Sequence, residues 1–218
     1  MNEKTLVGYH GTKIENVEQI LKNGFKMSKS KDNNLEWLGD GVYFWEDDYY
    51  AVQWNIIDIK GHNKEKNINS LKKYAIMKSI IKANKTKIFD ISSPEGSIIY
   101  QKLKEKLINR LIKEGYENYV DILSKRSCKY WIDLLQKNNF FNEFDIVTAV
   151  YKDEKSVENF KDDIILNVQK QICVKNINCI KETEIYDNKE RIFSLFSIIL
   201  KKREERKNEK NKKIIKKS

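Results

Sequence analysis

The sequence contains few of the residues that build metal sites, disulfides and membrane spans. Its three cysteines, Cys128, Cys173 and Cys179, form no Cys-x-x-Cys or His/Cys pair, which argues against structural disulfides and a zinc site. No apolar run reaches the roughly 18 residues that a membrane-spanning helix needs. The first residues lack the basic-then-apolar order of a signal peptide, so we expect a cytoplasmic protein with no metal and no membrane partner.

Proline and histidine are also scarce. The one proline, Pro94, follows two serines and predicts the start of a long helical stretch that is broken near Gly115. Of the two histidines, His62 lies among lysines and asparagines in a polar stretch, residues 61–69, that we interpret as a linker. His62 therefore has the surroundings of a surface residue, and His10 is the histidine of interest.

The charge is unevenly distributed along the 218 residues. Residues 201–218 carry ten Lys or Arg against three Glu, whereas residues 1–200 carry 32 against 29 acidic residues. With 40% hydrophobic and 34% charged residues, the chain is typical of one soluble domain, residues 1–200, followed by a basic tail, residues 201–218. Such a tail can contact nucleic acid, an acidic partner such as an antitoxin, or nothing.

The residue pattern predicts strands, then helices, then strands again, which is an α+β domain. The predicted strands are residues 5–9, 42–45, 74–82, 87–91, 145–151, 164–174 and 179–186. The predicted helices are residues 13–22, 47–59, 94–135 and 191–200. We expect 74–82 and 87–91 to form a hairpin, and residues 26–36 to be a loop that covers a pocket. Cys173 lies in an apolar run and is expected to be a core residue.

Two short motifs in the first quarter of the chain point to a ligand site. In the first, an apolar run ends on His10-Gly11-Thr12 and is followed by a helical pattern. In the second, the turn Gly39-Asp40-Gly41 leads into a short aromatic strand, residues 42–45. A glycine beside a histidine lets main-chain amides approach a flat ligand, and an aromatic strand offers a stacking face. Taken singly, each motif also fits a buried histidine or a core strand.

These motifs resemble the ADP-ribosyltransferase superfamily, on its diphtheria-toxin and poly(ADP-ribose)-polymerase side. That side carries a His-Gly-Ser/Thr strand, a helix, a Gly-x-Gly-Ile/Val-Tyr-Phe strand and an Ala-containing helix. Small bacterial stand-alone members, with a Trp-Leu-Gly-x-Gly-Val-Tyr-Phe-Trp-Glu signature, are the most similar in this stretch. The resemblance implies a split, mostly antiparallel sheet with flanking helices, and NAD as a substrate.

The resemblance also implies roles for individual residues. His10 would bind the adenosine-side ribose of NAD, and Gly11 would offer its N–H and C=O to the nicotinamide carboxamide. Tyr43 would stack on the nicotinamide ring, and Tyr50 lies near a second contact position. Thr12 would either help to hold the adenosine ribose or cap the helix that starts at residue 13.

The third motif of the superfamily is a strand that begins with a catalytic glutamate, and this chain departs from it. The matching position holds Gln171, and Gln169 lies on the same face if the register is two residues different. A glutamine hydrogen-bonds but brings no negative charge to an oxocarbenium ion. Polymer elongation is therefore disfavoured, or another carboxylate serves; Glu154 is the first candidate, ahead of its loop neighbours Asp153 and Glu158.

Several functions fit this sequence. The leading hypothesis is a mono-ADP-ribosyltransferase that uses NAD and acts as a bacterial toxin or defence effector. The basic tail slightly favours nucleic acid over protein as the acceptor, because Lys and Arg supply sequence-independent affinity for phosphates. The alternatives are an NAD glycohydrolase, an inactive module that binds NAD or nucleic acid, and a nucleic-acid-binding protein without NAD chemistry.

Overall fold

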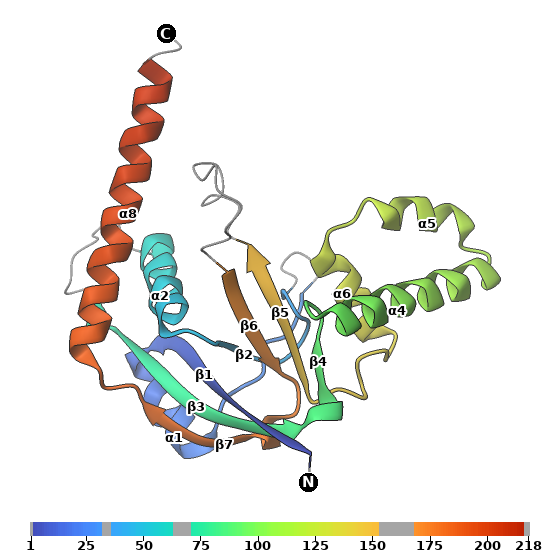
Figure 1. Cartoon of the computed structure of the whole chain (residues 1–218), viewed down its shortest axis with the longest axis horizontal. Helices are drawn as coiled ribbons and strands as arrows, with labels where there is room; N and C mark the ends of the chain where they lie inside the picture. The colour runs from blue at the N-terminus through green and yellow to red at the C-terminus, as the bar shows by residue number, and fades with distance from the viewer. Residues whose placement is uncertain (1, 32–35, 63–70, 153–167, 216–218) are drawn as a thin grey trace.

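The computed structural model describes residues 2–31, 36–62, 71–152 and 168–215, and they form the α+β fold that the sequence predicts (Figure 1). The strands make one seven-stranded sheet, in the order β4-β5-β6-β2-β1-β3-β7. Their bounds are β1 (Glu3–Lys13), β2 (Val42–Trp45), β3 (Tyr74–Asn84), β4 (Ile88–Asp90), β5 (Ile146–Lys152), β6 (Val168–Val174) and β7 (Ile180–Ile185). The pairing is antiparallel throughout except between β4 and β5.

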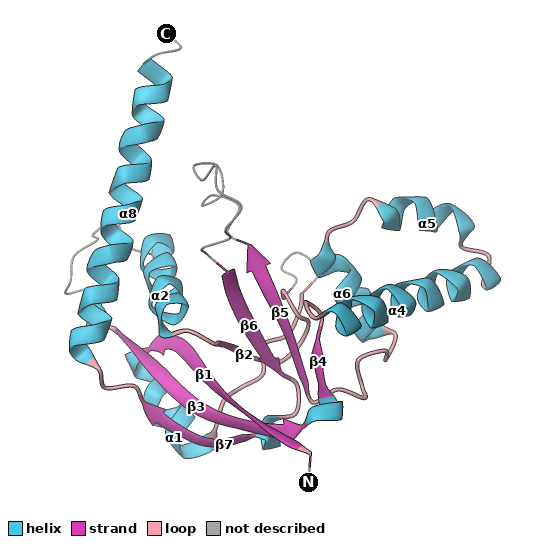
Figure 2. Cartoon of the chain, viewed as in Figure 1, coloured by secondary structure: helices cyan, strands magenta, loops and turns pink. Residues whose placement is uncertain are grey.

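The helices lie at two ends of this sheet (Figure 2). They are α1 (Val17–Asn23), α2 (Asp48–His62), α4 (Pro94–Lys113), α5 (Glu117–Ser124), α6 (Cys128–Lys137) and α8 (Lys189–Ile215). Helices α2 and α8 pack side by side near β1 and β3, sharing one apolar cluster. Helices α4 and α6 cover β4 and β5 and share another. Each helical layer therefore covers one half of the sheet.

Local sequence explains most of the helix boundaries. Helix α4 begins where predicted: Pro94 is its first residue, and the Ser93 hydroxyl accepts a hydrogen bond of 2.9 Å from the Gly96 N–H. The chain then turns at Gly115, whose φ of 85° is accessible to glycine at little cost. Helix α2 has its first turn capped by Asp47, which accepts from the Tyr49 N–H at 2.8 Å. Capping serines, aspartates and a turn glycine therefore determine these ends.

The predicted hairpin between residues 74–82 and 87–91 is wrong, although both strands exist. β3 pairs with β1 and β7, whereas β4 pairs with β5 in parallel, Ile88 opposite Ile146. A 3-10 turn, Lys85–Lys87, separates them; the Asn84 side chain accepts from the Thr86 N–H at 3.1 Å. β4 does not pair with β3, because β1 occupies one edge of β3 along its whole length and β7 occupies the other edge from Met77 to Ile81.

Three helix boundaries also differ from the predictions. The helix predicted from residue 13 begins as a 3-10 turn, Ile14–Asn16, and becomes α1 only at Val17. Helix α2 continues through Gly61 and His62, which the sequence pattern predicts to be part of a linker. The predicted end of the domain at residue 200 falls inside α8, which runs without a break from Lys189 to Ile215. The other predicted strands agree with the structure to within a few residues where they are described.

One buried cluster lies beneath the residues that the two motifs place together. Val42 and Phe44 of β2 join Leu6 of β1, Met77 of β3 and Ile172 of β6 in it. Phe44 is completely buried and belongs to the largest side chains of the core. This cluster fixes β1, β2, β3 and β6 relative to one another. Within the described ranges no helix is long and apolar enough to cross a membrane.

Candidate functional site: the opening between β1 and β2

His10 connects the two motifs directly. Its imidazole packs edge-on against Phe25 and Phe44, with ring centroids 5.1 and 5.9 Å away. Its Nδ1 lies 2.7 Å from the main-chain carbonyl oxygen of Tyr43. Because a carbonyl can only accept, Nδ1 carries the proton. Burial lowers the His10 pKa, the hydrogen bond to Tyr43 opposes this in part, and the neutral ring presents the lone pair of Nε2.

The hydrogen-bond ladder between β1 and β2 stops at this point. The Ile14 N–H donates to the Lys73 carbonyl at 2.8 Å, so Ile14 and every second residue before it hydrogen-bond towards β3. Tyr9 and Gly11 belong to the other set, and their main-chain groups therefore point towards β2. On β2, the Glu46 N–H donates to Lys170 of β6 at 3.1 Å, which directs Tyr43 and Trp45 towards β1 in the same way.

Tyr9 pairs with Trp45, and the next pair would be Gly11 with Tyr43. No such pair forms among the described residues, because the Tyr43 carbonyl accepts from His10 instead. The two strands therefore diverge, and the Gly11 N–H and C=O face the opening between them. We call this gap the β1–β2 opening.

Helix α2 requires a glycine at position 11. A Cβ at Gly11 would lie 2.5 Å from the Asn55 Oδ1 and 2.6 Å from the Ala51 carbonyl oxygen, both in α2. Asn55 is buried and donates through Nδ2 to the Ala75 carbonyl at 3.2 Å, which ties the helix to β3. Gly11 thus serves the packing of α2 as well as any ligand, and no local pattern predicted the role of Asn55.

Gln171 lies on β6, next to β2, and has a buried polar atom without a hydrogen-bond partner. It sits on β6 between Trp45 of β2 and Ala149 of β5, and only 6% of its surface is exposed. Its Oε1 is the one buried side-chain oxygen or nitrogen without a hydrogen-bond partner in the described part of the chain. A buried acceptor without a partner costs about 1–3 kcal/mol. A ligand that donates a hydrogen bond to Gln171 would recover this energy.

Aromatic side chains form a wall beside Gln171. Its strand neighbour Trp45 has ring centroids 5.8 Å from Tyr50 and 6.5 Å from Trp54. Tyr50 and Trp54 are four residues apart on α2, so they lie on one side of the helix. Trp54 is 49% exposed, which leaves a large aromatic face available for stacking. The predicted contact residue Tyr50 is therefore part of this wall.

Tyr43 uses its hydroxyl to hold the preceding loop. It accepts from the Leu38 N–H at 2.8 Å and donates to the Gly39 carbonyl at 2.5 Å. Burial is the main reason why the pKa of Tyr43 is raised far above its ordinary value, so the phenol stays protonated. Tyr43 is half-buried, and the sequence did not predict that its hydroxyl organises the loop.

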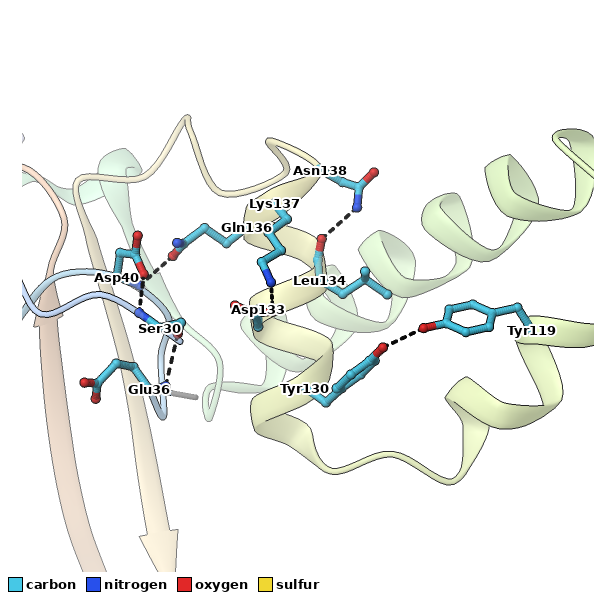
Figure 3. A network of polar contacts seen from close by, with 10 residues as sticks. All are labelled: Ser30, Glu36, Asp40, Tyr119, Tyr130, Asp133, Leu134, Gln136, Lys137 and Asn138. Carbon is cyan, nitrogen blue, oxygen red and sulfur yellow. Dashed lines mark hydrogen bonds and ion pairs between the residues drawn. The ribbon is translucent and has the colours of Figure 1, made fainter. Parts of the chain in front are cut away.

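The same loop is attached to α6 by polar contacts that no local pattern predicted (Figure 3). The Asp40 N–H donates to Gln136 Oε1 at 2.8 Å, and Lys175 Nζ donates to the same oxygen at 2.6 Å. Lys175 also donates to the Asp40 carbonyl at 3.1 Å, and burial lowers its pKa. Trp37 lies 43% exposed against Tyr151, with ring centroids 4.7 Å apart.

Comparison with known proteins places the chain in a family. The uncharacterized protein MJ0359 of Methanocaldococcus jannaschii is 30% identical over 193 residues, which cover 82% of this chain and 86% of the relative. The chain belongs to the same family. No protein-family model matches the sequence, and no solved structure matches it significantly.

Of the other predicted site residues, Thr12 and Gln169 lie in the described part of the chain and Glu154 does not. Thr12 is buried and accepts from Asn16 Nδ2 at 3.3 Å; it does not cap a helix, because the following 3-10 turn has Lys13 at its N-cap position and no side-chain cap. Gln169 is half-buried on the same face of β6 as Gln171. Glu154, like Asp153 and Glu158, lies outside the described residues. Cys173 is a core residue, as expected, and burial raises its pKa to about 11, which disfavours the thiolate.

The half-buried, neutral His10 predicts a pH dependence of stability. Its folded-state pKa lies below the ordinary 6.5, so the unfolded chain binds more protons between these two values. The contribution of His10 to the free energy of unfolding is therefore complete above pH 6.5 and is lost as the pH falls towards the folded-state pKa. We expect urea titrations to show a decline in stability below pH 6.5 that is smaller in His10→Asn. Identical pH profiles in the two proteins would contradict this.

Proposed function

We propose that this protein is an NAD-dependent mono-ADP-ribosyltransferase that modifies a macromolecular acceptor. The observation that carries the proposal is the β1–β2 opening, in which the main chain of Gly11 faces a missing ladder position near the buried, unsatisfied Gln171. Three features of the opening match parts of NAD, namely its carboxamide, its ribose hydroxyls and its flat nicotinamide ring.

The carboxamide of nicotinamide has one acceptor oxygen and one donor NH₂ group. The Gly11 N–H and C=O lie on one edge of β1 and complement this pair, as a neighbouring strand would. The neutral Nε2 of His10 accepts a hydrogen bond from a ribose hydroxyl, since Nδ1 is committed to the Tyr43 carbonyl. The wall of Trp45, Tyr50 and Trp54 offers a stacking surface for the nicotinamide ring.

The fold supports the same proposal. The mostly antiparallel sheet diverges between β1 and β2, and helical layers flank it at both ends. This arrangement agrees with the split sheet of the ADP-ribosyltransferase superfamily, and we infer that the chain has an ADP-ribosyltransferase-like fold. The three strands that correspond to the motifs of the superfamily would then be β1 with His10, β2 with Tyr43 and β6 with Gln171.

Gln171 favours single transfers over polymer formation. Its buried Oε1 can orient a ribose hydroxyl by accepting a hydrogen bond. It has no charge with which to activate the hydroxyl of an ADP-ribose unit that is already attached, so elongation is disfavoured. The resulting activity is mono-ADP-ribosylation.

The acceptor is proposed to be nucleic acid, with protein as the second choice. The C-terminal part of α8 projects away from the sheet, and it belongs to the segment with ten Lys or Arg against three Glu (Figure 1). Clustered positive charge attracts phosphate backbones without reading their sequence. An enzyme of this kind would act as a bacterial toxin or defence effector, and an acidic antitoxin is a further partner of the basic segment.

The proposal is tested by incubating the purified protein with NAD labelled in its adenosine half and a total cell lysate. We expect nicotinamide release together with label in the RNA, DNA or protein fraction, and that fraction identifies the acceptor class. Release with free ADP-ribose alone would replace the transferase by an NAD glycohydrolase. NAD binding without release would indicate an inactive module, and absence of NAD binding would refute the proposal. His10→Ala, purified in parallel, controls for contaminating hydrolases.

A further inference from the structure

Aromatic rings and cations alternate across the start of α6. The ring of Trp37, in the loop before β2, lies against Tyr151 and has the Lys129 ammonium 4.0 Å from its centre. The next residue of α6, Tyr130, has the guanidinium carbon of Arg126 5.2 Å from the centre of its ring. Two neighbouring rings are therefore each paired with a cation.

Helix α5 extends this arrangement. The hydroxyl groups of Tyr119 and Tyr130 lie 2.7 Å apart and join α5 to α6 (Figure 3). The rings reach the surface, because Trp37 is 43% exposed and Tyr119 is 39% exposed. We call the resulting surface the aromatic–basic stripe, and its members are Tyr151, Trp37, Lys129, Arg126, Tyr130 and Tyr119.

The stripe crosses a positively charged segment. Residues 122–132 contain Lys125, Arg126 and Lys129 and no acidic residue. The Glu36 carboxylate interacts electrostatically with Lys129 and offsets part of this charge. Lys125 and Arg126 are exposed in the turn between α5 and α6. Clustered Lys and Arg attract phosphates, so a polyanion is the class of partner that the charge favours.

The rings decide which polyanion fits. An acidic polypeptide would use the cations of the stripe and leave its rings unused. A nucleic-acid strand uses both, because its bases stack on aromatic faces while its phosphates contact Lys and Arg. An exposed cation–π pair is weaker than the stacking of a base on the same ring, so a base can replace the cation there. Only unpaired bases have free faces, which selects a single strand over a duplex.

The stripe also reaches the strand that carries Gln171. Tyr151, at its sheet end, is opposite Gln169 of β6. Gln169 and Gln171 are two residues apart, which is about 7 Å along a strand, and the three side chains share one face of the sheet. A nucleic acid on the stripe therefore has a part close to Gln171.

We propose that the aromatic–basic stripe binds single-stranded nucleic acid and brings it to the β1–β2 opening as the acceptor. The acceptor role rests on the proposed function, whereas binding of the strand does not. In the transfer, the C1′–nitrogen bond of NAD breaks and its electron pair passes to nicotinamide. A nucleophilic oxygen or nitrogen of the strand forms a bond to C1′, and its proton passes to solvent.

The test measures binding of the full chain to short fluorescein-labelled RNA and DNA strands, and to duplexes of the same sequence, by fluorescence anisotropy. We expect a single strand to bind at least about 10-fold more tightly than its duplex. Trp37→Leu keeps the main-chain carbonyl that accepts from the Tyr151 hydroxyl, and it is expected to weaken single-strand binding at least about 5-fold. Duplex binding should change less than about 2-fold, and Trp37→Phe, which keeps an aromatic face, should restore most of the single-strand affinity.

The charge of the stripe is tested through the salt dependence of binding. Arg126→Gln is expected to reduce the slope of log affinity against log salt concentration by about 0.7, the value for one phosphate contact on a single strand. Lys22→Gln changes an exposed lysine of α1 and is the matched control that keeps the wild-type slope.

The outcomes separate this inference from the proposed function. Wild-type affinity in Trp37→Leu, or a Trp37→Phe variant as weak as Trp37→Leu, would overturn the stripe as the binding surface. Equal affinity of wild type for strand and duplex would overturn it as well, and competition by polyglutamate as strong as by the strand would replace nucleic acid by an acidic protein. Nicotinamide release without strand binding would leave only the proposed function standing. Strand binding through the stripe without nicotinamide release would refute the proposed function and support the stripe alone.

Discussion

His10→Ala is expected to release nicotinamide from NAD at least about 100-fold more slowly than wild type. The substitution removes the Nε2 acceptor and also the Nδ1–H that occupies the Tyr43 carbonyl. Without the imidazole, the Gly11 N–H can donate to that carbonyl, because both already point towards each other across the register of β1 and β2. The ladder would then extend by one pair and close the opening. Steady-state nicotinamide release by the two purified proteins measures the effect.

His10→Asn separates these two roles. The Asn Nδ2 lies near the place of the imidazole Nδ1 and can donate to the Tyr43 carbonyl, but no acceptor replaces Nε2. We expect a folded protein that binds NAD more weakly and releases nicotinamide slowly. An unchanged release rate in His10→Ala would show that the opening is not the catalytic site. A loss of circular dichroism in His10→Ala but not in His10→Asn would assign the effect to folding.

Phe44→Ala is expected to lower the free energy of unfolding by about 3–5 kcal/mol. Phe44 is completely buried, its ring centroid lies 5.1 Å from that of Phe25, and it forms one side of the pocket that holds His10. β1 approaches it closely: a Cβ at Gly8 would lie 2.7 Å from the Phe44 Cβ. The cavity left by the ring therefore cannot collapse without moving β1. Urea denaturation followed by circular dichroism measures the change.

Phe193→Ala is the matched control for this experiment. The Phe193 side chain is on α8 and 41% exposed, so its removal is expected to cost no more than about 1 kcal/mol. A change in Phe44→Ala that is as small as in Phe193→Ala would mean that β1 and β2 do not share a packed core. Since His10 packs against Phe44, that outcome would also remove the structural basis of the site.

Much of the fold could be predicted because it is set by residues close together in the sequence. The aromatic strand at residues 42–45 follows a turn with two glycines, and its bounds agree with β2. The start of α4 follows from Ser93 and Pro94, and its end from Gly115. The partner of β4 could not be predicted in this way, since its pairing with β5 joins segments about 58 residues apart. Periodicity identifies a strand but contains no information about which edge it will join.

The candidate site could likewise be predicted only where it depends on short stretches of sequence. The sequence identified His10, Gly11, Tyr43 and Gln171 as candidates from two short motifs and one strand. It could not show that the His10 ring occupies the Tyr43 carbonyl or that Gln171 Oε1 is left without a hydrogen-bond partner. The contact between Asp40 and Gln136 spans 96 residues of sequence, and no local pattern reports it.

The sequence by itself therefore determined the α+β class, most strand and helix positions, and the residue types that face the candidate site. Only the tertiary structure decided that the ladder between β1 and β2 stops before Gly11, and that Asp40 in the loop before β2 is hydrogen-bonded to Gln136 of α6. The physical reason is that local propensity and hydrophobic period act over a few residues. An unpaired strand edge and a buried amide oxygen without a hydrogen-bond partner arise only when distant segments pack together.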